Sequence, residues 1–187
     1  MLGIEIAKAG GQVVHANGDA DLDIVLEAVN TSLIHSTTVI GEDTDLLVLL
    51  LYHLKHPVDS EKLYFRTDKE AKHIKVYDIA LIKQIMGERV CKRLLFLHAF
   101  TGCDTTSRIF RIGKSTAFSR LMKSIKLGKS ADLFTTVGKN VEEISTAGCE
   151  AMLTLFNSKE ESLAKLRHNQ LTSKVFSSKG GWDGLVV

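Results

Sequence analysis

The stretch Thr37-Thr38-Val39-Ile40-Gly41-Glu42-Asp43-Thr44-Asp45-Leu46-Leu47 decides the fold of this chain of 187 residues. Residues 37–40 are β-branched and few, which predicts a short buried strand. Gly41 ends that strand and leaves residues 42–45 on a turn. Residues 46–54 are so apolar that periodicity cannot separate helix from strand, and we expect a short helix or a helix–strand junction.

Upstream of this stretch, the sequence predicts the end of a helix, a short strand and a full helix. Residues 2–8 have the pattern of a helix end, and residues 12–15 are β-prone and precede the turn-like Ala16-Asn17-Gly18. Asp19 stands where an N-cap belongs, and apolar residues recur at helical spacing behind it. Strands that alternate with helices imply an α/β fold with a parallel sheet, whose ligands lie beyond the carboxyl ends of the strands.

Downstream, two further strands and a series of helices are expected. Residues 63–67 and 73–77 resemble short strands around a polar turn, and Asp78 is placed to cap a helix. The predicted helices after this point cover residues 79–86, 88–100, 116–125, 141–156 and 162–176. The tail, residues 177–187, looks loose.

Composition restricts the class of protein. A hydrophobic content of 44% with a charged content of 25% is typical of a soluble globular protein. The longest apolar run, residues 46–52, is too short to span a bilayer, so we expect no membrane partner. The cysteines are three in number and scattered, which favours a reducing compartment. We therefore expect an intracellular protein, with the nucleus favoured over the cytoplasm.

Charge is distributed unevenly along the chain, although the net charge is only +2. Residues 9–54 contain no Lys or Arg, whereas residues 105–131 contain no acid. The basic residues of that second segment are Arg108, Arg111, Lys114, Arg120, Lys123, Lys126 and Lys129. The first segment could hold cations and the second could hold phosphates, or both could be solvated faces that differ in sign.

Five aspartates in three clusters are the candidate functional residues: Asp19 with Asp21, Asp43 with Asp45, and Asp104. Any one of them alone would be read as an N-cap or a turn residue. Clustered carboxylates repel one another unless a cation lies between them, and hard divalent cations prefer such oxygen ligands. The combination therefore predicts Mg²⁺ or Mn²⁺, the ions that support phosphoryl chemistry on nucleic acids.

Three stretches carry a resemblance to a known family: residues 18–21, residues 39–47, and residues 97–104 leading into 111–117. Their order and spacing are similar to the flap endonuclease (XPG-type) branch of the PIN-like nucleases. The resemblance implies a PIN-like parallel sheet flanked by helices, followed by a helical hairpin and C-terminal helices. By it, residues 1–125 are the downstream part of the nuclease core, with the hairpin near 101–125, and residues 126–187 are a helical extension.

The resemblance also implies an activity, structure-selective endonucleolytic cleavage by a two-metal mechanism. Its catalytic and metal-binding residues would be Asp19, Asp21, Asp43, Asp45 and Asp104. One ion would lower the pKa of the attacking water and the other would stabilise the leaving oxygen. The residues that would hold the phosphates of branched or flapped DNA are Arg108, Arg111, Gly113 and Lys114. The hairpin of the family also binds K⁺ through backbone carbonyls.

The chain departs from the family pattern in ways that leave two functions open. The family has two more aspartates upstream of Asp19, which implies that the sequence is truncated at its N-terminus. Arg111 stands where the hairpin has its first glycine. The chain is therefore either a metal-dependent nuclease, or a truncated fragment of one, or a catalytically inactive PIN-like module that binds nucleic acid or protein.

Overall fold

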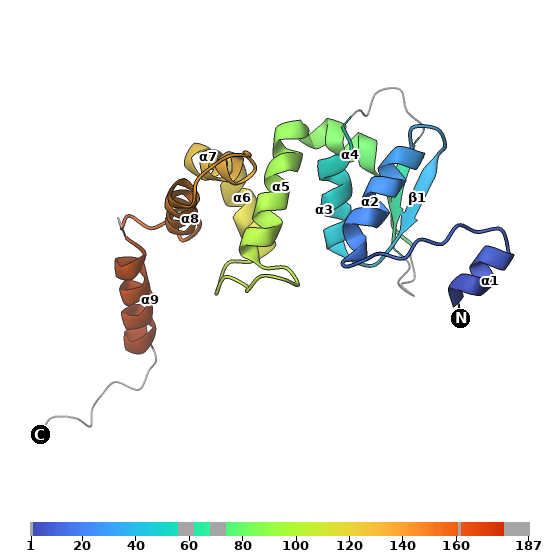
Figure 1. The fold of residues 1–187 in the computed structure, drawn as a ribbon. Helices are drawn as coiled ribbons and strands as arrows, with labels where there is room; N and C mark the ends of the chain where they lie inside the picture. The colour runs from blue at the N-terminus through green and yellow to red at the C-terminus, as the bar shows by residue number, and fades with distance from the viewer. Residues whose placement is uncertain (1, 56–61, 68–73, 161, 178–187) are drawn as a thin grey trace, which may run out of the picture. The chain divides into compact units, whose positions relative to one another are not determined.

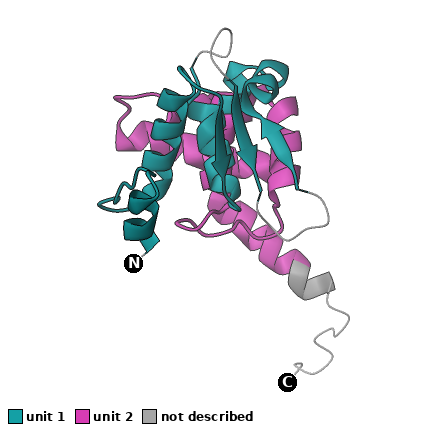
Figure 2. Cartoon of the chain, turned by 90° about the vertical axis from the view of Figure 1, so that its right-hand side faces the viewer, with its two compact units in different colours: residues 1–91 teal, residues 92–187 magenta. Residues whose placement is uncertain are grey.

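The structure is a computed structural model that describes residues 2–55, 62–67, 74–160 and 162–177. The chain divides into two compact units, unit 1 (Met1–Cys91) and unit 2 (Lys92–Val187), drawn in different colours in Figure 2. The described part contains nine helices and one sheet of three strands, so the expected α/β class is confirmed.

The sheet of unit 1 has the order β1-β2-β3. Its strands are β1 (Thr37–Ile40), β2 (Leu63–Arg66) and β3 (Val76–Asp78). β1 and β2 are parallel, with Thr37 opposite Leu63, whereas β3 is antiparallel to β2. The expectation of an entirely parallel sheet is wrong at β3, because residues 67–75 are too few for the crossover that a parallel neighbour needs. The sheet is therefore mixed.

The helices of unit 1 follow the predicted pattern closely. They are α1 (Leu2–Lys8), α2 (Ala20–Thr31), α3 (Thr44–His53), α4 (Ile79–Met86) and the start of α5 (Glu88–Thr101). The region from residue 46 is thus a helix. The strand expected over residues 12–15 is wrong, since residues 11–16 have no regular secondary structure. Strand conformation is stabilised by a paired neighbour, and no strand of the described chain pairs with this segment.

The core of unit 1 is built from α2, α3, β2 and α4. Val25, Leu50 and Ile79 are fully buried, and Leu63 and Phe65 of β2 are no more than 2% exposed. α3 packs against both α2 and α4. Burying side chains of this size contributes roughly 1.5–3 kcal/mol each. This core holds α2 and α3 side by side.

Unit 2 is helical. After the remainder of α5 come α6 (Lys114–Lys123), α7 (Ile125–Phe134), α8 (Val141–Leu155) and α9 (Leu163–Ser177). α7 was not expected from the sequence, although Ser124 marks its start by accepting a hydrogen bond from the Leu127 amide at 3.1 Å. His73 of the expected strand 73–77, and residues 178–187 of the expected loose tail, lie outside the described residues.

Three phenylalanines organise the core of unit 2. The ring of Phe96 lies 4.8 Å from that of Phe100 and 4.9 Å from that of Phe134, measured between centroids. Fully buried Leu127 and Leu155 extend this cluster into α7 and α8. Among the helices of the described residues, none combines the length and the apolar character needed to cross a membrane.

Candidate functional site

The first predicted acid, Asp19, is the N-cap of α2. Its backbone is extended (φ −67°, ψ 124°), and its Oδ1 accepts a hydrogen bond from the Asp21 amide at 3.1 Å. This bond satisfies an amide that has no partner within the helix. Asp21 lies in the first turn of α2, where the helix dipole favours negative charge.

The second pair repeats this geometry at the start of α3. Asp43 is the N-cap, with an extended backbone (φ −87°, ψ 137°), and its Oδ1 accepts from the Asp45 amide at 3.0 Å. Asp45 lies in the first turn of α3. Each Asp-x-Asp run therefore consists of one capping carboxylate and one carboxylate in the first helical turn.

The two Asp-x-Asp runs lie at the same end of unit 1. α2 packs against α3, and Figure 1 shows both helices starting at the end of the unit where β1 finishes. The carboxylates therefore lie at the N-termini of α2 and α3, which are the positive ends of the two helix dipoles. The structure thus brings Asp19, Asp21, Asp43 and Asp45 to one end of the unit, beyond the carboxyl end of β1.

These four acids are not gathered tightly around one point. Among the described residues of unit 1, no three His, Cys, Asp or Glu side chains have ligand atoms within 4.8 Å of one another. The N-cap bonds also engage one oxygen of Asp19 and one of Asp43. A structural role therefore explains the position of the two capping acids without an ion.

The fifth acid, Asp104, belongs to unit 2 and is exposed in the loop between α5 and α6. Gly102 begins this loop with φ +112°, and a Cβ there would lie 2.8 Å from the Arg108 Cα. The loop therefore requires glycine at this position. The five predicted acids do not all lie in one unit.

Hydrogen bonds hold the loop around Asp104 in a fixed shape. Thr106 Oγ1 donates to the Ala99 carbonyl at 2.6 Å and accepts from the Cys103 amide at 3.1 Å. The Cys103 thiol lies 3.3 Å from the hydroxyls of both Thr105 and Thr106. Hydrogen bonds from Thr105 first, and then from Thr106, lower the pKa of this thiol.

The predicted phosphate-binding residues lie in the same loop and at the start of α6. Gly113 is the N-cap of α6 and makes no side-chain capping bond, so the first amides of the helix are oriented to meet an anion. Lys114 Nζ lies 3.1 Å from His98 Nδ1. Arg111 adopts φ 64°, a left-handed conformation that glycine adopts more readily, and its guanidinium lies over the Phe110 ring at 5.2 Å.

One basic residue near this loop was not anticipated from the sequence. Arg108 and Arg111 line a hollow of about 450 Å³ together with Arg167 of α9. The floor of the hollow is apolar and includes Phe156 and Leu166. Arg167 lies outside the basic segment 105–131, so charge counting along the chain could not connect it with the other two.

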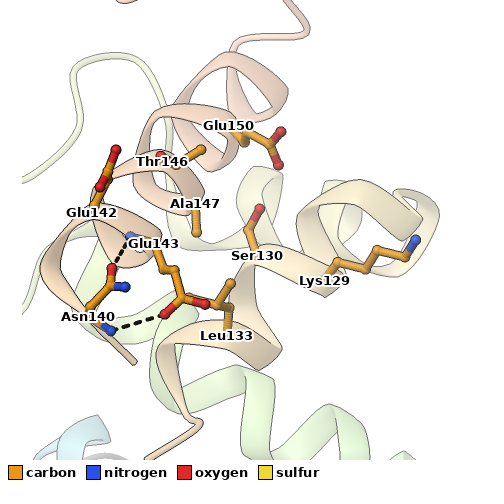
Figure 3. A pocket seen from close by; sticks show the side chains of 9 residues that line it. All are labelled: Lys129, Ser130, Leu133, Asn140, Glu142, Glu143, Thr146, Ala147 and Glu150. Atoms are coloured by element: carbon orange, nitrogen blue, oxygen red, sulfur yellow. Dashed lines mark hydrogen bonds between the residues drawn. The ribbon is translucent and has the colours of Figure 1, made fainter. Parts of the chain in front are cut away.

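A second hollow of unit 2, of about 360 Å³ between α7 and α8, is lined by three glutamates and one lysine, Lys129. Figure 3 shows Glu142, Glu143 and Glu150 on its wall. Glu143 and Asn140 form a reciprocal capping box: the Glu143 amide donates to Asn140 Oδ1 at 2.8 Å and the Asn140 amide donates to Glu143 Oε2 at 3.1 Å. Carboxylates on this wall disfavour phosphate, so the basic loop is the better candidate for binding nucleic acid.

Compared with known proteins, the chain matches no protein-family model, no curated protein and no solved structure.

Proposed function

We propose that this chain is a PIN-like module of the flap endonuclease type, which hydrolyses phosphodiester bonds of branched or flapped DNA with Mg²⁺ or Mn²⁺. The observation that carries the proposal is the repeated Asp-x-Asp arrangement at the starts of α2 and α3, two packed helices that begin at one end of unit 1. A DNA substrate is also the reason to expect the protein in the nucleus.

The chemistry of the donor set fits the proposed ions. Aspartate oxygens are the ligands that Mg²⁺ and Mn²⁺ prefer, and all four side chains at the starts of α2 and α3 supply them. Each capping bond engages one of the two carboxylate oxygens of Asp19 and Asp43. When bound, the ions would activate a water molecule and stabilise the leaving oxygen. By the family resemblance, Asp104 would be a further metal-binding acid.

The basic loop would supply affinity for the DNA backbone. Arg108, Arg111 and Lys114 are exposed, and the first amides of α6 follow Gly113 directly. Such contacts bind phosphates without reading the sequence of bases and release counterions. By the family resemblance, backbone carbonyls of the same region would hold K⁺.

A second candidate function is an inactive PIN-like module that binds nucleic acid or a protein. It is favoured by a specific observation: within the described residues of unit 1, no three ligand atoms of the acids lie within 4.8 Å of one another. The capping bonds alone give Asp19 and Asp43 a structural role. Cleavage and binding must therefore be measured separately.

The cleavage experiment uses a labelled 5′-flap DNA with Mg²⁺ or Mn²⁺. We expect weak cleavage by the unmodified chain and none by Asp45→Ala or Asp43→Asn. The Asn variant keeps the N-cap, because an amide oxygen also accepts the amide hydrogen bond, and removes only the charge. Asp78→Asn is the matched control, since Asp78 is the N-cap of α4 and its Oδ1 accepts a hydrogen bond from the Leu81 amide at 2.9 Å.

Three results would decide between the two functions. Loss of cleavage in Asp43→Asn with retention in Asp78→Asn would support the nuclease. Equal cleavage by all variants would show that the activity does not come from these acids. No cleavage at high Mn²⁺, with intact DNA binding, would favour the inactive module.

The binding experiment uses filter binding to branched DNA in EDTA across a salt series. We expect affinity to fall steeply with salt, and each of Arg108→Ala and Lys114→Ala to reduce the slope by about 1. Lys165→Ala, at an exposed lysine of α9 outside the loop, is the control. A signal that does not change with salt would contradict both the nuclease and a module that binds nucleic acid.

A further inference from the structure

The strand β1 lies at an edge of the sheet of unit 1. Within the described residues it pairs with β2 and with no other strand, because the strand order is β1-β2-β3. The Thr37 amide donates to the Lys62 carbonyl at 2.8 Å, and the Gly41 amide donates to the Arg66 carbonyl at 3.0 Å. Backbone groups of alternate residues face opposite edges of a strand. The amides and carbonyls of Thr38 and Ile40 therefore face away from β2.

A large hollow opens along this strand. Its volume is about 1120 Å³, and its lining includes every residue of β1, much of α2 and the irregular segment 12–18. Several large apolar side chains on this lining are exposed: Val14 by 70%, Ile24 by 43%, Leu26 by 41% and Ile40 by 58%. An edge strand beside exposed apolar side chains is a template for an additional strand.

The charge of the hollow restricts what can occupy it. Its lining carries Asp19, Asp23 and Glu27 and has neither Lys nor Arg. Over the wider range 9–54 the sequence also lacks both residue types. A second copy of the chain would bring the same acidic α2 to the hollow, and nucleic acid would bring phosphates. Both are disfavoured by repulsion between like charges.

We propose that the β1 edge binds a β-strand of another protein, a segment of alternating apolar residues flanked by Lys or Arg. Main-chain hydrogen bonds to Thr38 and Ile40 extend the sheet by one strand. The apolar side chains cover Ile24 and Ile40, and the flanking cations lie near Asp23 and Glu27. This mode of recognition gains affinity from the main chain and specificity from side chains on alternate positions.

The test is fluorescence anisotropy with labelled synthetic peptides and the full chain. The first peptide has a core of alternating Val and Thr flanked by lysines. The second has the same core flanked by glutamates, and the third carries N-methyl groups on the core amides, which block strand pairing. We expect the lysine-flanked peptide to bind at least about tenfold more tightly than either of the others at low salt.

Variants of the protein test the two parts of the proposal separately. Asp23→Lys combined with Glu27→Lys should reverse the preference, so that the glutamate-flanked peptide binds more tightly. Thr38→Pro removes an amide that faces away from β2 and should abolish binding of every peptide. The N-methyl peptide gives the same information with the unmodified chain, should Thr38→Pro fail to fold.

Three outcomes would overturn the proposal. The first is failure of the lysine-flanked peptide to bind, and the second is equal binding of the N-methyl peptide. The third is a dimer of the chain in analytical ultracentrifugation that Thr38→Pro dissociates, because the occupant of the edge would then be a second copy.

Discussion

Arg93 and Asp132 form a two-point ion pair that joins α5 to α7 in unit 2. Arg93 Nε donates to Asp132 Oδ1 and Arg93 Nη2 donates to Asp132 Oδ2, each at 2.6 Å. The hydrogen bonds to Asp132 raise the pKa of the Arg93 guanidinium. A bidentate pair of this kind fixes the orientation of both side chains, which a single contact does not.

Removing the charge of Asp132 should destabilise unit 2. We expect Asp132→Asn to lower the free energy of unfolding by about 1–2 kcal/mol, at the low end for hydrogen bonds to charged groups. Solvent screening limits the effect, since the Asp132 side chain is 45% exposed. Urea denaturation followed by circular dichroism measures it. Glu142→Gln, at an exposed acid of α8, is the control, and equal effects of both changes would contradict the prediction.

Gly128 leaves room for the Arg93 side chain. A Cβ at Gly128 would lie 2.6 Å from Arg93 Nη1 and 2.8 Å from its Cζ. Alanine is favoured over glycine within a helix by about 1 kcal/mol. We expect Gly128→Ala to give no gain in stability in the unmodified chain, and about 1 kcal/mol in the Arg93→Ala background. A thermodynamic cycle from the four unfolding curves tests this, and equal effects in both backgrounds would refute it.

The capping box of α8 should make stability depend on pH. The Lys139 ammonium, at 2.7 Å, and then the Asn140 amide lower the pKa of Glu143 below its ordinary value of 4.5. The folded state therefore releases this proton more readily than the unfolded state. Glu143 stabilises the fold fully above its ordinary pKa, and this contribution is lost as pH falls through the lowered value.

Glu143→Gln should remove that dependence while its carbonyl oxygen still accepts from Asn140. We expect the unmodified chain to be the more stable protein at pH 7 and the two to converge in strong acid. Unfolding free energies at several pH values measure the difference. Glu142→Gln is the control, and a constant gap between Glu143→Gln and the unmodified chain would argue against the assignment.

The N-cap of α3 should respond differently to alanine and to asparagine. Asp43→Ala removes the acceptor for the Asp45 amide, and we expect a loss of about 1 kcal/mol of stability. Asp43→Asn keeps the acceptor, and we expect its loss of stability to be at most a few tenths of a kcal/mol. Thermal denaturation compares the two. If both variants lose the same stability, the charge matters to the fold and the capping bond does not.

The Arg111→Gly variant should be more stable than the Arg111→Ala variant. Both substitutions remove the guanidinium and its contact with Phe110, so their difference isolates the backbone conformation at φ 64°. A left-handed residue with a Cβ costs roughly 1–2 kcal/mol, and glycine avoids this cost. We therefore expect Arg111→Gly to exceed Arg111→Ala in unfolding free energy by about 1 kcal/mol. Equal stabilities would show that the turn relaxes in the variants.

Local signals were sufficient at some of the element starts that the sequence marks. Asp19 and Asp78 were expected to cap helices and do so, whereas Asp43, which was placed on a turn, is the cap of α3 in the structure. The β-branched run of β1 was predicted at its observed bounds. α7 was missed because Ser124, its cap, directly follows the end of α6, and two helices in tandem resemble one interrupted pattern.

Properties that depend on distant partners could not be derived in this way. The β-prone segment 12–15 forms no strand, since pairing depends on a neighbouring strand and not on composition. The direction of β3 depended on the length of its connection to β2. For the acids, sequence indicated the cluster but not the distances between carboxylates. Those distances depend on how α2 packs against α3.

The boundary between the two units falls inside α5, between Cys91 and Lys92. A cut at this point would leave only Glu88–Cys91 of the helix on the first fragment, about one turn, too short to stay helical by itself. It would also place the fully buried Cys91 at a chain end. Expression of either half for separate study should therefore retain Glu88–Thr101 whole, so that the two fragments overlap in sequence.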